Sequence, residues 1–230
     1  RRNERRPFPP DLGQRLTGAT VTGLGRRAKY GLIDTDRGDT LVFHLGMSGR
    51  WRIDPEELGK HDHFVIETAR HRLALNDARR FGSIDLVSTG ELAEWPAFKA
   101  LGPEPLGPDF DAAHLAKAFE DRTAPVKALL LDQRIVAGLG NIYVCEALYL
   151  ARIAPTRPAV AYAVRTWPST WSSPTVGASS PAVTRNRCST AAAALCVQRC
   201  SYRVSRSTPT CGGRVSRMSP IPSRTSLATA

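Results

Sequence analysis

The chain has 230 residues, of which 42% are hydrophobic and 23% charged, and its formal net charge is +11 at pH 7. This length allows one or two domains with a buried core. The sequence contains neither an apolar run long enough for a membrane-spanning helix nor a secretory signal, so we expect neither.

The positive charge is concentrated near the C-terminus. All 21 acidic residues and 23 of the 32 basic ones lie within residues 1–159, whereas residues 160–230 contain nine arginines and no acid. The basic composition alone therefore does not indicate nucleic-acid binding. The positions of the charges within residues 1–159 are more informative.

Short β-like segments occupy the first part of the chain, at a spacing of about ten residues. They are Ala19–Gly25, Tyr30–Thr35, Asp39–Leu45, Gly49–Ile53, His63–Thr68, His71–Asp77 and Gly82–Val87. Turn-forming residues such as those of Asp36–Asp39 separate them. The pattern predicts an antiparallel sandwich or barrel.

The pattern changes after residue 100. Three prolines in Leu101–Phe110 exclude a helix or a central strand there, which predicts a hinge between domains. Apolar residues then recur with a helical period, and the first helix is expected to start after Asp109 as its N-cap. Two more helices are expected, over Ala124–Gln133 and over Asn141–Ile153, so this part is predicted to be a small helical domain with a helix–two-turn–helix arrangement.

Residues 160–230 are rich in Ser, Thr, Arg, Pro and Ala and show neither sustained helical periodicity nor strand alternation. One interpretation is a disordered basic arm. The other, which we favour, is translation in a shifted reading frame, because such a frame typically gives an acid-free run of this composition. Both interpretations predict an irregular tail.

Three loop clusters in the β region are candidates for function. The stretch "RRAKYG" holds Arg26, Arg27 and Lys29, which at a strand edge would ordinarily be solvated charges. In "HLGMSG", Met47 lies between two glycine-bearing bends, an unusual place for a residue that mostly fills cores. In "NDARRFG" we expect Arg79 and Phe81 at a hairpin tip, where Phe81 either folds back under its hairpin or enters a base stack.

A fourth candidate is the turn "GLGN", Gly138–Asn141, at the start of the third helix. It is either a tight turn between packed helices or a turn whose amides and positive helix end hold a phosphate. Two tips able to fill the space of an extruded base, together with a phosphate clamp, are the parts needed by an enzyme that flips a base out of duplex DNA.

Eight motifs in order make the chain resemble the formamidopyrimidine-DNA glycosylase family over about residues 5–158. They are "RRAKYG", "HLGMSGRWRI", "PEEL-KHDH", "DARRFG", "LGPEPL", "VKALLLDQ", "VAGLGNIYVCEAL" and "ARIAPTR". The resemblance implies base-excision repair: removal of oxidised purines such as 8-oxoguanine and formamidopyrimidines, then strand cleavage by β,δ-elimination. It also implies a monomer that binds damaged double-stranded DNA, without a membrane, in the bacterial cytoplasm at the nucleoid.

The resemblance implies roles for individual residues. Lys29 matches an active-site lysine beside the lesion sugar. Met47 and Phe81 match residues that fill the gap in the duplex, and Arg79 one that pairs with the orphaned cytosine. The positions that match contacts to the DNA backbone are His61, Arg122, Lys127, Gly140 and Asn141.

The chain also departs from the family pattern. The family's nucleophilic N-terminal proline and adjacent glutamate have no match, and about forty residues of the family pattern are expected to be missing before the matched part. We therefore expect base excision to be abolished or severely reduced, with weak lyase activity surviving through Lys29. The family's zinc finger of two Cys-x-x-Cys pairs is not recognisable, because Cys196 and Cys200 are spaced Cys-x₃-Cys, so no cofactor or metal site is expected in this chain.

The predicted fold is therefore α+β. Residues 1–100 form an incomplete antiparallel β-sandwich, 101–110 the hinge, 111–159 the helix–two-turn–helix domain and 160–230 the irregular tail. A catalytically dead DNA-binding remnant or a pseudogene product is the alternative function. A helix–two-turn–helix binder of the ribosomal or topoisomerase type would explain the "GLGN" turn but not the Met47 and Phe81 tips.

Overall fold

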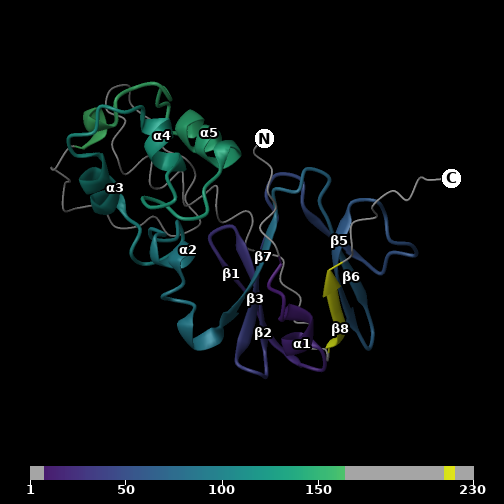
Figure 1. Cartoon of the computed structure of the whole chain (residues 1–230). Coiled ribbons are helices and arrows are strands. Elements are labelled where there is room, and N and C mark those ends of the chain that lie inside the picture. Colours follow the sequence, from purple (N-terminus) through teal and green to yellow (C-terminus); the bar gives the residue numbers. More distant parts are fainter. Residues whose placement is uncertain (1–7, 164–214, 221–230) are drawn as a thin grey trace, which may run out of the picture. The chain divides into compact units, whose positions relative to one another are not determined.

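The computed structural model describes residues 8–163 and 215–220 (Figure 1). Contacts divide it into two compact units. One contains the chain up to Lys99 together with a strand from the C-terminal region, and the other begins at Ala100. No helix in the described ranges is both long enough and apolar enough to cross a bilayer.

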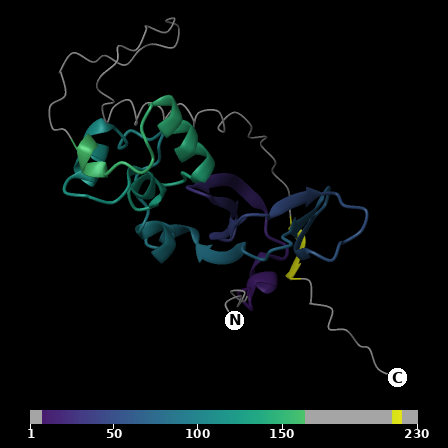
Figure 2. The same cartoon turned by 90° about the horizontal axis from the view of Figure 1, so that it is seen from above.

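The first unit contains two antiparallel sheets of four strands, which form the expected sandwich (Figures 1 and 2). In one sheet the order is β1 (Val21–Arg27), β2 (Tyr30–Thr35), β3 (Asp39–His44) and β7 (Ser83–Ser88). In the other it is β4 (Arg50–Ile53), β6 (Arg72–Asn76), β5 (Asp62–Thr68) and β8 (Val215–Pro220). Each strand expected between residues 19 and 87 is present, with ends that differ by at most two residues.

The core of this unit draws residues from both sheets and from the short helix α1 (Leu12–Leu16). Its fully buried members include Leu16, Leu41 and Phe64. Leu41 and Phe64 face the core because successive residues of a strand point to opposite faces of the sheet. The sequence analysis missed α1, and also η1 (Thr89–Glu91) and α2 (Pro96–Lys99), because elements of three to five residues are too short to show a helical period.

Strand β8 lies within the tail that was predicted to be irregular, so that prediction does not describe Val215–Pro220. β8 pairs antiparallel with β5, from Phe64 opposite Pro220 to Thr68 opposite Val215. A strand edge is bound through main-chain hydrogen bonds, which require no particular side-chain pattern. The pairing was therefore not visible in the sequence, and the remainder of the tail beyond Ala163 lies outside the described residues.

Two loops carry the chain between the sheets. Residues 45–49 lead from β3 to β4, and residues 77–82 lead from β6 to β7. The prediction that Arg79 and Phe81 sit at a hairpin tip is therefore wrong, because β6 and β7 belong to different sheets. A hairpin turn and a loop between two sheets contain the same kinds of turn residues. Only the strands that pair on either side show which of the two is present.

The second unit contains three α-helices and a 3-10 helix among the described residues. They are α3 (Ala112–Phe119), α4 (Val126–Leu131), α5 (Asn141–Leu150) and η2 (Ala159–Tyr162). The cap of α3 is Asp111 rather than the expected Asp109, because the Asp111 Oδ1 accepts a hydrogen bond of 2.7 Å from the His114 amide. Phe119, Leu130 and Val144 bring all three α-helices into one core.

The proline-rich stretch at residues 101–110 contains no helix or strand, as expected. It is tied to the second unit: the Gly102 amide donates to the Gln133 carbonyl at 2.9 Å, and the Ala137 amide donates to the Pro103 carbonyl at 3.0 Å. Phe110 is buried in the helical core. The stretch therefore packs as part of the second unit.

Candidate functional site

The two loops that cross between the sheets start and end side by side. His44, before the first loop, pairs with Ser83, after the second. Arg50, after the first loop, pairs with Asn76, before the second. We call residues 45–49 the Met47 loop and residues 77–82 the Phe81 loop. Strand register therefore brings together two loops that are far apart in sequence.

The backbones of the two loops approach each other closely at Gly46. A Cβ at this position would lie 2.7 Å from the Phe81 carbonyl carbon and 2.9 Å from the Gly82 nitrogen. Gly46 also has a φ of +63°, in the left-handed region that favours glycine. Both constraints require glycine, so this residue permits the loops to touch.

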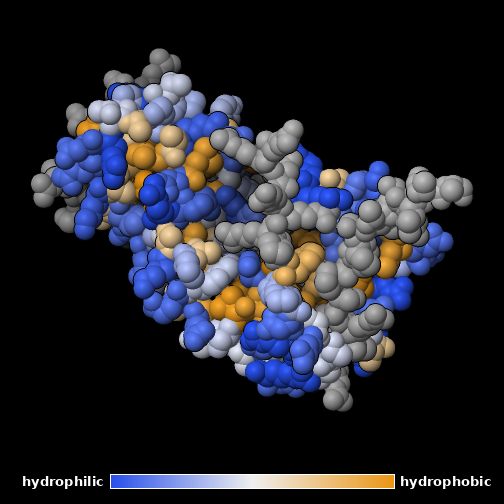
Figure 3. All heavy atoms as spheres, viewed as in Figure 1, coloured by the Kyte–Doolittle hydropathy of each residue, from blue (hydrophilic) through white to orange (hydrophobic). Residues whose placement is uncertain are grey.

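Both loops expose large apolar side chains. Met47 is 73% exposed and Phe81 is 46% exposed, and the Arg79 guanidinium lies 4.8 Å from the centre of the Phe81 ring. Phe81 therefore does not fold back under its loop into the core. Hydrophilic residues dominate the face shown in Figure 3, and hydrophobic ones gather in smaller areas. An exposed Met beside an exposed Phe and an arginine suits insertion between stacked bases.

Lys29 lies in the tight turn between β1 and β2, next to Ala28, whose φ is +53°. The Arg26 guanidinium holds this turn by donating to the Ala28 carbonyl at 2.6 Å. Lys29 is exposed, but the protein atoms around its amine reduce the hydration of the charged form, and this desolvation lowers the pKa of Lys29 below its ordinary value. A lysine with a lowered pKa has a larger neutral fraction, which is the form that attacks a carbonyl.

His44 was not among the predicted site residues, yet it lies between Lys29 and the Met47 loop. It pairs with Tyr30 across the sheet, with ring centres 5.0 Å apart, and its Nδ1 accepts from the Gly46 amide at 3.0 Å. Burial, with a contribution from the Lys29 charge, lowers the pKa of His44. The imidazole is thus neutral with its proton on Nε2. Its position in "HLGMSG", directly before the loop, was the available signal.

His61 belongs to the same corner of the first unit. Its carbonyl accepts from the Asp77 amide at 2.9 Å, which places it against the start of the Phe81 loop. The neighbouring Asp62 is buried and accepts hydrogen bonds from Arg52, Gly59 and Asn76. These bonds fix the loop that presents His61. The structure therefore gathers His61, Met47, Arg79 and Phe81 at one end of the sandwich, with Lys29 connected through His44.

The remaining predicted residues lie in the second unit. Gly140 is the N-cap of α5 and Asn141 its first residue. Gly140 has no side chain to cap the first amides of this helix, so they remain available to an anion. The turn before them is clamped by Gln133, whose Nε2 donates to the carbonyls of Leu131 and Leu139 and whose Oε1 accepts from the Gly138 amide at 2.9 Å. Sequence analysis did not single out Gln133.

Lys127 and Arg122 flank the start of α4. The Lys127 amide donates to the Pro155 carbonyl at 3.3 Å, and the Val160 amide donates to the Arg122 carbonyl at 2.8 Å. These bonds join the segment before α4 to residues 155–160 and hold both basic residues on an ordered backbone. A hydrogen bond from Arg134 is the main cause that lowers the pKa of Asp132. The positive charge of Arg122 lowers it further by a small amount.

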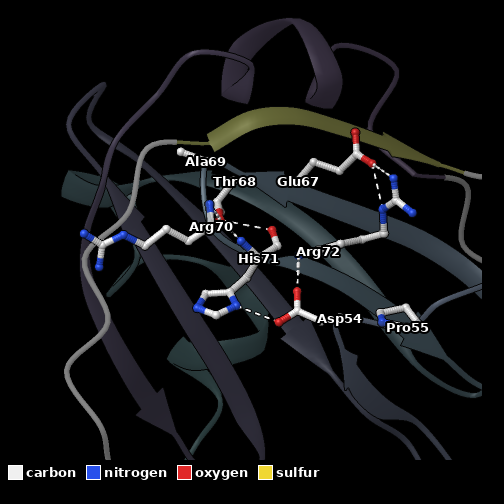
Figure 4. Close-up of a pocket in the computed structure, with 8 residues that line it drawn as sticks. All are labelled: Asp54, Pro55, Glu67, Thr68, Ala69, Arg70, His71 and Arg72. Carbon is white, nitrogen blue, oxygen red and sulfur yellow. Dashed lines mark hydrogen bonds and ion pairs between the residues drawn. The ribbon is translucent and has the colours of Figure 1, made fainter.

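A surface hollow lies elsewhere, around the turn between β5 and β6, and contains none of the predicted site residues (Figure 4). Its carboxylates both have partners: Asp54 Oδ2 lies 2.7 Å from His71 Nδ1, and Glu67 Oε1 lies 2.8 Å from the Arg72 guanidinium. These pairs leave little net charge to select a ligand.

Within residues 8–163 and 215–220, no group of three or more His, Cys, Asp or Glu side chains is placed to hold a metal ion. Cys188, Cys196, Cys200 and Cys211 lie outside the described residues. The fifth cysteine, Cys145, lies on α5 within the described residues; it is exposed and forms no disulfide.

Two family models match the chain. The formamidopyrimidine-DNA glycosylase N-terminal domain matches residues 1–84, and the formamidopyrimidine-DNA glycosylase H2TH domain matches residues 101–169. A formamidopyrimidine-DNA glycosylase of Novosphingobium aromaticivorans is 77% identical over 154 residues, and that of Zymomonas mobilis is 55% identical over 155 residues. The alignments cover 66% and 67% of this chain, and in both cases 57% of the relative. The chain thus spans little more than half the length of these relatives.

Solved structures agree with the sequence matches. A Lactococcus lactis protein in complex with DNA that contains FAPY-dG superposes with a TM-score of 0.69 and 30% identity, over 84% of this chain and 66% of that one. The Lactococcus lactis formamidopyrimidine-DNA glycosylase bound non-covalently to DNA with an abasic site gives a TM-score of 0.60 and 36% identity, over 65% and 58%.

Proposed function

The chain belongs to the formamidopyrimidine-DNA glycosylase family, and from this premise we propose that it acts in base-excision repair on duplex DNA containing an oxidised purine. The substrates we propose are 8-oxoguanine and ring-opened formamidopyrimidines. The observation that carries the proposal is the pair of adjoining exposed tips formed by the Met47 and Phe81 loops.

Extruding a base from a duplex leaves a gap in the stack and an unpaired partner base. Met47 and Phe81 are apolar and exposed, and the backbones of their loops meet at Gly46, so we propose that both side chains enter this gap. When its partner base is extruded, the cytosine loses the donors that faced its N3 and O2 atoms. Arg79, whose guanidinium lies over the Phe81 ring, carries donors that can replace them. Inserted apolar side chains also kink DNA, which favours the extruded state of the lesion.

Backbone contacts would hold the DNA while the tips act. In the first unit, Lys29 and His61 are the proposed phosphate-side contacts. In the second unit, Lys127, Arg122 and the open amides at Gly140 and Asn141 take this role. Contacts of this kind fix register and orientation but carry no sequence information, which suits an enzyme that must find a lesion in any sequence.

The chemistry we assign to a described residue is that of Lys29. Its neutral amine attacks the C1′ aldehyde of an opened abasic sugar, and loss of water gives an imine. Removal of a C2′ proton then breaks the C3′–O bond and releases the 3′ phosphate, which is the β-elimination step. This step already cuts the strand. Loss of a C4′ proton would then break the C5′–O bond, so that the sugar leaves with the amine and a gap with phosphate at both ends remains. The lowered pKa of Lys29 supports the first step.

The test is borohydride trapping on one duplex with an abasic site and on another with 8-oxoguanine. We expect a covalent adduct on the abasic duplex that is lost in Lys29→Ala and kept in Lys60→Ala, a matched change at an exposed lysine. An adduct on the 8-oxoguanine duplex would show that the chain excises the base before it forms the imine. Binding without any adduct would favour the alternative, a DNA-binding remnant.

A second measurement isolates the tips. Fluorescence anisotropy should show tighter binding to an abasic duplex than to an undamaged one, and Met47→Ala with Phe81→Ala should remove about tenfold of that preference. Ile53→Ala, a change at another exposed apolar residue on β4, is the control and should leave it intact. If the tip variants kept the full preference, the insertion role would be wrong.

A further inference from the structure

One carboxylate connects the two loops. Asp77 is 3% exposed and stands at the start of the Phe81 loop. Its Oδ1 accepts from the Ser48 hydroxyl at 2.6 Å and from the Arg79 amide at 3.2 Å, and its Oδ2 accepts from the Gly82 amide at 2.8 Å. Ser48 belongs to the Met47 loop, so the Asp77 side chain bonds both loops at once.

Further bonds fix Asp77 itself. Its amide donates to the His61 carbonyl at 2.9 Å, and its carbonyl lies 3.0 Å from His63 Nε2 and accepts from the Arg80 amide at 3.3 Å. The Ser48 hydroxyl also accepts from the Arg79 amide at 3.3 Å. Asp77 is therefore held by the β5 side of the sheet while its carboxylate reaches outward to the loops.

The groups around the carboxylate match its charged form. Burial alone would raise the pKa of Asp77, but hydrogen bonds from Ser48, Gly82, Arg79 and Arg80 outweigh it and hold the pKa below its ordinary value. An ionised carboxylate only accepts hydrogen bonds, and each of these neighbours donates. An amide in its place would turn an NH₂ group toward at least one donor.

We propose that Asp77 is a positioning residue that locks the Met47 loop and the Phe81 loop into one two-pronged unit before DNA is bound. What the prongs do rests on the proposed function, but their coupling is a property of the free chain. Ordering both loops in advance removes an entropic cost from insertion, so the locked form binds a gapped stack more tightly.

Amide hydrogen exchange on the free full chain tests the coupling. Asp77→Asn should accelerate exchange about tenfold at residues 46–49, in the other loop, as well as at 79–82. Ser48→Ala, which removes the two hydrogen bonds of the Ser48 hydroxyl to Asp77 and to the Arg79 amide but leaves the other bonds of Asp77, should accelerate exchange in the same segments to a smaller degree. Asp62→Asn is the matched control, because Asp62 is equally buried and equally bonded but reaches neither loop. Unchanged exchange at 46–49 in Asp77→Asn would overturn the proposal.

A binding cycle separates positioning from general destabilisation. Asp77→Asn should weaken binding to an abasic duplex about tenfold in the wild-type background. It should have little further effect when Met47 and Phe81 are already alanine, since no prongs remain to be positioned. An equal loss in both backgrounds would mean that Asp77 acts through stability alone and would contradict the proposal. If the wild type itself does not prefer the abasic duplex, the proposed function fails, while the exchange experiment still decides the coupling.

Discussion

Replacing Gly46 with alanine is expected to force the two loops apart. The φ of +63° costs an alanine about 1–2 kcal/mol. The new Cβ would also lie 2.7 Å and 2.9 Å from backbone atoms of Phe81 and Gly82, which cannot rotate away as a side-chain end could. Overpacking of this kind costs about 1–3 kcal/mol. Together the two effects should lower the free energy of unfolding by about 2–5 kcal/mol.

Gly38→Ala is the control for this experiment. Gly38 has a φ of +75°, but a Cβ there would meet no atom within 4 Å, so its replacement carries the backbone strain without the clash. The loss of unfolded-state entropy is the same in both variants and cancels. Urea unfolding of the two proteins isolates the clash as the difference. If Gly46→Ala were no less stable than Gly38→Ala, the close approach of the loops would be refuted.

Three further outcomes can be measured. Hydrogen bonds from Asn76 and Gly59 and the Arg52 charge outweigh the effect of burial and lower the pKa of Asp62. The stabilisation from Asp62 is therefore present above its unfolded-state pKa of about 3.9 and lost as the pH falls through the lower folded-state value, so urea unfolding of wild type and Asp62→Asn should converge on acidification. In NMR of reductively methylated protein, the Lys29 amine should titrate below the ordinary lysine pKa of about 10.4, and a resonance that titrates at or above that value would contradict the lowered pKa. Asp111→Ala should cost about 1 kcal/mol through the lost cap of α3 and Asp109→Ala less than about 0.5 kcal/mol; equal thermal shifts would restore Asp109 as the cap.

Regular elements were predictable because their side chains repeat. Tyr30–Thr35 was predicted with both ends correct, because a short apolar run ends at the turn residues of Asp36–Asp39. The helices were found from their period, but the cap of α3 was misplaced by two residues because Asp109 and Asp111 are both good caps and only the folded backbone chooses between them.

The site residues could be named from motifs, but their connections could not. Met47 and Phe81 were singled out because exposed apolar residues beside glycine and arginine are unusual. Whether their two loops meet depends on which strands pair, and these pairs join residues that are far apart in the sequence. Asp77, Ser48 and Gln133 were missed for a related reason: each acts through hydrogen bonds to backbone distant in sequence or to a turn whose shape is not readable locally.

The pairing of β5 with β8 has a consequence for the order of folding. Phe64 and Pro220 lie far apart in the sequence, so their pairing closes a very long loop, and the entropic cost of closure rises with loop length. Contacts of this kind form late, after hairpins such as β1–β2 and β2–β3. During synthesis, β5 must also wait until Val215–Pro220 has been made. Until then its edge is open, and the half-made sandwich is a template on which a second nascent chain can add a strand.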